Sequence, residues 1–148
     1  MPSQAGGLAD LYFQQHYKRA AILRFYMECD DPKVDFKYKF GILLNLDVTE
    51  TDALLAITTS NLKPFASGFL ENDIVRIPGG KYPCFPKEET IINLREIRIE
   101  PVTKLRSLCE QKQMTFEGVL DASDMIDVNG RLAASRLIEK YLKKRIVL

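Results

Sequence analysis

Two apolar runs separated by a short polar turn constrain the fold of this chain more than any other feature. The runs are Phe40–Leu46 and Ala53–Ile57, and the turn between them spans Asp47–Asp52. This pattern is typical of a buried β-hairpin, with strands predicted over Lys39–Leu46 and Asp52–Thr59. Because both runs are almost wholly apolar, the strands are expected either to be buried on both faces or to close a small barrel.

The N-terminal part contains one helix and one segment that fits two structures. Leu8–Tyr17 predicts a short helix with its apolar residues on one face. Arg19–Met27 fits either a continuation of that helix or a separate strand, because a short apolar run does not distinguish the two. Its aromatic content and the breaker Asp30–Pro32 that follows it favour the strand.

The clearest strand pattern lies at Thr90–Glu100, after a shorter predicted strand at Asp73–Ile77. Ile92 and Leu94 alternate with polar residues, but the isoleucines that follow Glu96 continue in the opposite phase. A slip of one residue turns every later side chain to the other face of the sheet, so the pattern predicts a β-bulge near Glu96. A small barrel requires strongly bent strands of this kind.

Helical patterns dominate the end of the chain. Pro101 suits the first turn of one helix, and Thr115 suits the N-cap of a second. Asn129–Gly130 predicts a break, after which Ala134–Leu142 has the spacing of an amphipathic helix.

Strands therefore come first and helices last. This order predicts the α+β class, with a small curled antiparallel β-barrel and C-terminal helices packed on one side. The length of 148 residues predicts one domain over residues 1–148. Within it, the strands of the barrel are expected over residues 19–100 and the helical part over residues 101–148.

Composition narrows the possible functions. The net charge of +1, from 21 basic and 20 acidic residues, excludes a strongly basic protein that coats nucleic acid but allows a local basic patch. The three cysteines form no CxxC pair, so a reducing cytoplasm is predicted. The single His16 and the scattered cysteines indicate no metal site, and no cofactor motif is present. No apolar run has the length of a membrane span.

Two groups of residues in or beside the hairpin could carry chemistry. The segment Thr58–Asn61 ends the second strand, where its hydroxyls could donate to a phosphate or form an ST-turn. The lysines of Lys33–Lys39 alternate with aromatic residues toward Phe40. This pattern suits single-stranded nucleic acid, and it equally suits an edge strand protected by charge. Arg95 lies on a polar face of the last long strand, either along a groove or in a solvated surface.

The order of these segments resembles the MazF/PemK-like toxin family, whose members are small bacterial endoribonucleases with an SH3-like barrel. The similar segments are Lys39–Asn45, Ile57–Asn61 and Thr90–Arg98. They stand where the family has an Arg-Pro strand, a strand that ends in Thr-Ser, and the last strand of the barrel. The resemblance covers roughly Arg19 to Leu105.

The resemblance implies metal-independent cleavage of single-stranded RNA, with Lys39 and Thr59 as the catalytic residues. Lys39 stands at the position of the family's catalytic arginine and keeps its charge, but lacks the planar fork that grips a phosphate. Lys39 would stabilise charge on the scissile phosphate, while Thr59 would position the attacking 2′-hydroxyl. The implied RNA-binding residues are Lys37, Tyr38, Ser60, Asn61 and Arg95.

The resemblance also implies the partners, because family members act as homodimers and are silenced by an antitoxin peptide that lies across the groove. Single-stranded RNA, an antitoxin-like protein and a second copy of the chain are therefore the expected partners. The alternative function is a catalytically silent SH3-like barrel that binds a protein or peptide. Departures from the family pattern at Lys39, Asn93 and Arg95 favour this alternative.

Overall fold

The computed structural model describes residues 7–28, 36–59, 71–86 and 89–148. The elements in chain order are α1 (Gly7–His16), β1 (Ala21–Glu28), β2 (Phe36–Leu43), β3 (Asp52–Thr59), the 3₁₀ helix η3 (Glu71–Asp73), β4 (Ile74–Pro78), β5 (Glu89–Pro101), α2 (Val102–Glu110), β6 (Met114–Val119), α3 (Ala122–Ala134) and α4 (Lys140–Ile146). The segment with two possible interpretations, Arg19–Met27, is thus mostly strand β1, and the predicted helix at Leu8–Tyr17 is confirmed as α1.

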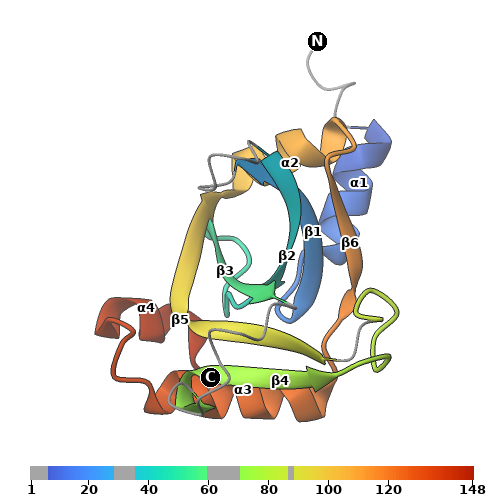
Figure 1. The fold of residues 1–148 in the computed structure, drawn as a ribbon. Helices are drawn as coiled ribbons and strands as arrows, with labels where there is room; N and C mark the ends of the chain where they lie inside the picture. Colours follow the sequence, from blue (N-terminus) through green and yellow to red (C-terminus); the bar gives the residue numbers. More distant parts are fainter. Residues whose placement is uncertain (1–6, 29–35, 60–70, 87–88) are drawn as a thin grey trace.

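The six strands among the described residues form one antiparallel sheet in the order β4-β5-β3-β2-β1-β6. The predicted α+β class is confirmed. The sheet is strongly curved (Figure 1), but within the described residues no ladder joins its edge strands β4 and β6. The sheet of the described strands is therefore open, and closure into a barrel is not shown.

Helices cover both faces of the sheet, which explains why its central strands are apolar without interruption. Leu23, Leu43 and Leu55 are fully buried on one face, in a cluster that includes residues of α1 and α2. Ile22 and Ile42 are fully buried on the opposite face, in a cluster that includes residues of α3 and α4. Figure 1 shows the two pairs of helices at opposite ends of the view. The prediction that the helices pack on one side is wrong, because successive residues of the central strands are apolar and both faces of the sheet must therefore be covered.

Strand β5 bends sharply, as the change of phase in its sequence predicts. Its ladder with β3 passes from the pair Ala56↔Ile97 to the pair Thr58↔Ile92, so the register shifts between them. The part before the bend also pairs with β4, and the part after it pairs with the first half of β3 (Figure 1). The irregularity lies in the segment that contains Glu96, and the predicted bulge is confirmed.

Two predictions for the C-terminal part are wrong. Thr115 does not cap a helix: it lies in β6, which pairs with the edge of β1 and places Phe116 against the ring of Phe13. The pairing with β1 provides hydrogen-bond partners for the backbone N–H and C=O groups of β6. A segment of this length is too short to form a stable helix by itself.

The second error concerns Asn129–Gly130, which lies inside α3 and does not break it. The Asn129 Oδ1 atom accepts hydrogen bonds from the Leu148 backbone and from Arg19, so the asparagine has a tertiary role. Helix α3 instead ends at Ala134, so the predicted helix over Ala134–Leu142 is interrupted from Ser135, and α4 begins at Lys140.

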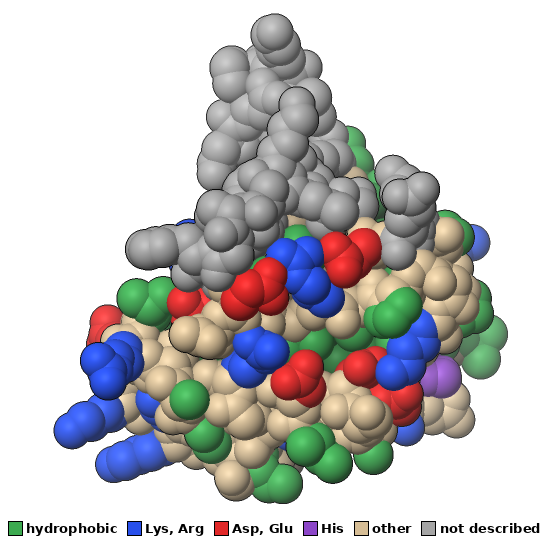
Figure 2. Space-filling model, turned by 60° about the horizontal axis from the view of Figure 1, so that its bottom comes forward, with side chains coloured by type: hydrophobic (Ala, Val, Ile, Leu, Met, Phe, Trp, Pro, Cys, Tyr) green, Lys and Arg blue, Asp and Glu red, His purple; other side chains and the backbone are tan. Residues whose placement is uncertain are grey.

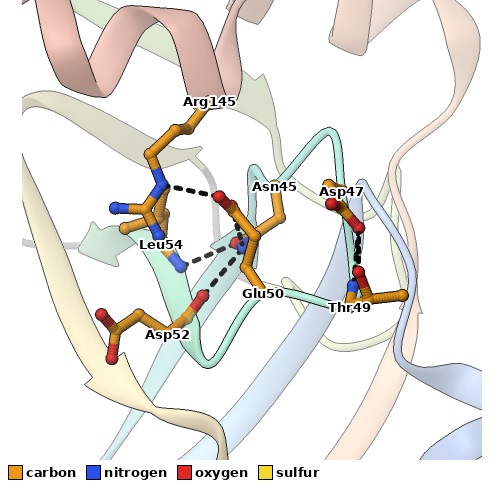
Figure 3. A network of polar contacts seen from close by, with 7 residues as sticks. All are labelled: Asn45, Asp47, Thr49, Glu50, Asp52, Leu54 and Arg145. Atoms are coloured by element: carbon orange, nitrogen blue, oxygen red, sulfur yellow. Dashed lines mark hydrogen bonds and ion pairs between the residues drawn. The ribbon is translucent and has the colours of Figure 1, made fainter.

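The turn of the β2–β3 hairpin is held by a buried side chain and by the C-terminal helix (Figure 3). Asn45 is fully buried; its Nδ2 donates to the Asp52 carbonyl at 2.8 Å, and its Oδ1 accepts from the Leu54 N–H at 2.8 Å. Glu50 accepts a hydrogen bond from Arg145 Nε at 3.0 Å. These contacts tie the turn to α4 at the end of the hairpin opposite to Lys39 and Thr59.

Candidate functional site

Lys39 and Thr59 lie on the same face of neighbouring strands. The register pairs Lys39 with Phe25 of β1, and it pairs Gly41, two residues further along β2, with Ile57 of β3. Side chains alternate along a strand, and those of paired residues share a face. Both predicted catalytic residues therefore lie on the face of the cluster that includes α1 and α2, and both are half-buried.

Tyr38 lies on the opposite face of β2 from Lys39. Its register partner is Tyr26, and their ring centroids are 5.0 Å apart. The guanidinium of Arg24 stacks over the Tyr38 ring, 3.8 Å from its centroid. The structure thus separates Tyr38 from the predicted catalytic pair and groups it with two β1 residues, Arg24 and Tyr26, that sequence reasoning missed. The signal for them was the two-residue alternation of β1, which could be used only once that segment was known to be a strand.

Three other predicted RNA-binding residues are Lys37, Ser60 and Asn61. Ser60 and Asn61 lie outside the described residues. Lys37 lies in β2 opposite Met27 of β1. The grouping of these residues with Lys39 stays a prediction.

Arg95 is exposed near the bend of β5, where it lines a pocket that it shares with other elements. We call this the arginine pocket; it has a volume of about 730 Å³ and is lined by Asn72, Asp73, Arg95, Gly130, Arg131, Ala134, Ser135, Arg136 and Leu137. The lining comes from η3, β5, α3 and the segment after α3. Neither Lys39 nor Thr59 is among the described residues that line this pocket.

A polar cluster that sequence reasoning missed joins the β4–β5 connection to the start of α3. Lys81 Nζ lies 2.9 Å from Asp124 Oδ2 and 3.1 Å from Asp121 Oδ2. The Tyr82 hydroxyl donates to Asp124 Oδ2 at 2.5 Å and accepts from the Asp121 N–H at 2.9 Å. Lys81 follows Gly79–Gly80, and its neighbours in space are carboxylates about 40 residues away along the chain.

The ionisation of this cluster suits a structural tie and not proton transfer at neutral pH. Burial raises the pKa of Tyr82 to about 12. Hydrogen bonds to Asp124 and Asp121 raise the pKa of Lys81. The Asp124 N–H and Lys81 together lower the pKa of Asp121. Each of these shifts moves the pKa away from neutrality, so the groups keep one protonation state there.

Other site types are not apparent in the part of the chain that the structure describes. No group of three or more His, Cys, Asp or Glu side chains is placed to hold a metal ion there. Cys84 and Cys109 carry thiols that form no disulfide, and burial raises the pKa of both. Within the same residues, no helix combines the length and the apolar character needed to cross a bilayer.

Comparison with models of known protein families gives no match, and comparison with curated proteins gives no significant match. The resemblance to MazF/PemK-like toxins therefore stays a prediction based on three short segments. The placement of Lys39 and Thr59 is the geometric observation that bears on it.

Proposed function

We propose that this chain is a MazF/PemK-like endoribonuclease that cleaves single-stranded RNA without a metal ion. The observation that supports the proposal is the placement of Lys39 and Thr59 on one face of two neighbouring strands. A cation and a hydroxyl on one sheet face can contact the same phosphodiester. The proposal includes the SH3-like closure of the sheet, a homodimer, an antitoxin-like partner and a cytoplasmic location.

In the proposed reaction the RNA supplies its own nucleophile. The 2′-hydroxyl loses its proton to water, its oxygen attacks the adjacent phosphorus, and the bond from phosphorus to the 5′-oxygen of the next nucleotide breaks. The products are a 2′,3′-cyclic phosphate and a 5′-hydroxyl, which forms when the leaving 5′-oxygen takes up a proton from water. The Lys39 ammonium stabilises the negative charge that develops on the phosphate oxygens, and the Thr59 hydroxyl donates a hydrogen bond that orients the phosphate or the attacking group.

Incubating the purified protein with a long single-stranded RNA in the presence of a chelator tests this function. We expect fragments that end in 2′,3′-cyclic phosphate. Lys39→Ala and Thr59→Ala should each lower the cleavage rate about 100-fold, since removal of one donor to a developing oxyanion typically costs about that much. Lys39→Arg should retain cleavage, because arginine restores the planar fork.

The matched controls are Lys18→Ala and Thr103→Ala, which remove an exposed lysine and an exposed threonine outside strands β2 and β3. Both control variants should cleave at the rate of the original chain. If the protein produces no fragments, or if Lys39→Ala and Thr59→Ala cleave as fast as the controls, the proposed function is wrong.

A protein-binding module is the second candidate, and the surface of α4 favours it. The last turn of α4 carries Lys143, Lys144 and Arg145, and Figure 2 shows basic side chains gathered at the left edge of the view, where α4 lies. Tyr141 and Leu137 are exposed beside them. A basic surface with apolar residues suits an acidic, amphipathic partner.

Capture experiments in the native host distinguish this candidate from the nuclease. The original chain should retain an acidic protein, and Lys140→Glu combined with Lys144→Glu should release it. Lys18→Glu combined with Lys112→Glu is the control with the same change of net charge. Cleavage of RNA that depends on Lys39 would contradict a catalytically silent module.

A further inference from the structure

We propose that the arginine pocket binds a small molecule that carries a phosphate group. The pocket is separate from Lys39 and Thr59, and the proposal does not depend on RNA cleavage. Its evidence is the charge of the lining, the orientation of one arginine and the space beside α3.

The charge of the lining selects for an anion. Arg95, Arg131 and Arg136 come from β5, from α3 and from the segment that follows α3, whereas Asp73 is the one acidic residue among the described lining residues. Three arginines from separate segments line one space; Asp127 pairs with Arg131, so Arg95 and Arg136 are the cations that an anion in the pocket would chiefly meet. Arginine suits phosphate because its planar N–H donors match the phosphate oxygens in pairs.

The Arg131 side chain is held in place by the protein itself. Its Nε atom donates to Asp127 Oδ1 at 3.2 Å, and its Nη1 atom donates to the Glu71 carbonyl. These two bonds orient the guanidinium and leave it further N–H donors for a ligand. Arg95 and Arg136 are exposed, so they can close on the ligand from the rim.

The shape of the pocket indicates a molecule larger than a free ion. Gly130 and Ala134 present little side chain from α3, and a Cβ atom placed on Gly130 would meet nothing within 4 Å. The volume of about 730 Å³ lies within the usual range for small-molecule sites, about 300 to 1,000 Å³. Ala134 and Leu137 add apolar surface for the uncharged part of the ligand.

Titration of the full chain by calorimetry and by amide NMR tests the proposal. The probes are adenosine 5′-monophosphate and ribose 5-phosphate, with adenosine, ribose and inorganic phosphate as comparison ligands. At least one phosphorylated probe should saturate a single site and shift the amides of Arg95, Gly130 and Ala134. Its counterpart without phosphate should bind at least about tenfold more weakly, because charge-assisted hydrogen bonds to the phosphate are lost.

Variants of the lining separate a pocket effect from general electrostatics. Arg95→Gln combined with Arg136→Gln should weaken binding at least about tenfold, since two charge-assisted contacts are removed. Gly130→Met should abolish binding by filling the space beside α3. Gly130→Ala should bind within about twofold of the original chain. Lys18→Gln combined with Lys112→Gln, which removes the same charge from exposed residues elsewhere, should do so too.

Circular dichroism and thermal unfolding of each variant verify that the fold is intact. The proposal is overturned if neither phosphorylated probe saturates a site, or if the shifted amides lie away from the pocket. It is also overturned if inorganic phosphate alone binds as tightly as both probes, or if folded Gly130→Met and the double arginine variant bind like the original chain. None of these outcomes depends on whether the protein cleaves RNA.

Discussion

Tyr17 is a buried residue whose hydroxyl weakens the fold. The residue is 8% exposed, its ring stacks on Phe13 with the centroids 4.8 Å apart, and its hydroxyl has no hydrogen-bond partner among the described residues. A buried hydroxyl without a partner loses its hydration and gains nothing in return. Burial also raises the pKa of Tyr17 from 10.0 to about 12.

We therefore expect Tyr17→Phe to raise the free energy of unfolding at pH 7, by about 1 kcal/mol. Because the pKa of Tyr17 is higher in the folded than in the unfolded state, ionisation of this residue lowers the free energy of unfolding as pH rises from about 10 toward 12 and has no effect at lower pH. Urea unfolding at pH 7 and at pH 11 should thus show a smaller alkaline loss in Tyr17→Phe. Tyr141→Phe, at an exposed position, is the control; a less stable Tyr17→Phe at pH 7 would show that the hydroxyl is bonded.

Asn45 differs from Tyr17, because its buried polar side chain forms hydrogen bonds within the protein. Replacing it with alanine leaves the Asp52 carbonyl and the Leu54 N–H without their partner inside the protein. Asn45→Ala should lower the free energy of unfolding by about 2 to 4 kcal/mol, measured by urea unfolding. Asn72→Ala, at an exposed asparagine, should change it by less than about 0.5 kcal/mol. Equal effects of the two substitutions would contradict the role given to Asn45.

At the scale of elements, the bend of β5 and the course of α3 show two different relations between sequence and structure. The bend follows from a local change of phase, because each side chain of a strand must face either the core or the opposite side. The continuation of α3 through Asn129–Gly130 has no such local signal. Those two residues are poor helix formers, and the surrounding contacts outweigh their preference.

Substitution of Gly130 tests whether a residue with low helix preference lies within α3. Its backbone φ is not in the left-handed region and its Cβ position is open, so Gly130→Ala should stabilise α3 by about 0.5 to 1 kcal/mol. Gly80 has a φ of +82°, so Gly80→Ala should destabilise the protein by about 1 kcal/mol although no neighbour is close. Thermal unfolding of both variants measures the difference. A melting temperature for Gly130→Ala below that of the original chain would contradict the helical assignment at this residue.

At the scale of the whole molecule, the two-sided sheet makes the C-terminal helices part of the core. Ile146 of α4 is fully buried in the same cluster as Ile22 and Leu54 of the sheet. The Leu46 N–H donates to the Arg145 carbonyl at 2.9 Å, which adds a backbone contact between α4 and the hairpin. Removal of packing at Ile146 should therefore weaken the whole fold and not α4 alone.

Ile146→Ala should lower the free energy of unfolding by about 2 to 5 kcal/mol, because it leaves a cavity in the core. Leu148, two residues later, is 88% exposed, and Leu148→Ala should have little effect. Urea unfolding followed by circular dichroism and by tyrosine fluorescence should give coincident transitions for Ile146→Ala. A separate early transition, or equal stability of the two variants, would show that α4 is not part of the cooperative core.

Much of the fold could be predicted from local patterns. Residues 39–59 alternate two apolar runs with a polar turn, and Leu8–Tyr17 has helical spacing, so β2, β3 and α1 were predicted near their observed bounds. Thr115 and Asn129–Gly130 were misinterpreted because their local preferences are weak and distant partners override them. The candidate site followed the same division. The common face of Lys39 and Thr59 agrees with a hairpin register, and the opposite face of Tyr38 follows from the alternation along β2. The place of Arg95 in a pocket shared with η3 and α3 does not follow from its spacing.

The sequence alone was sufficient to predict the apolar hairpin and the bend of β5. Both depend on the two-residue period of a strand, which acts between neighbours along the chain. The tertiary structure was needed to show that helices cover each face of the sheet, that β6 pairs with β1, and that three arginines surround one pocket. These features join residues far apart along the chain, and they depend on how surfaces fit together, which no local pattern encodes.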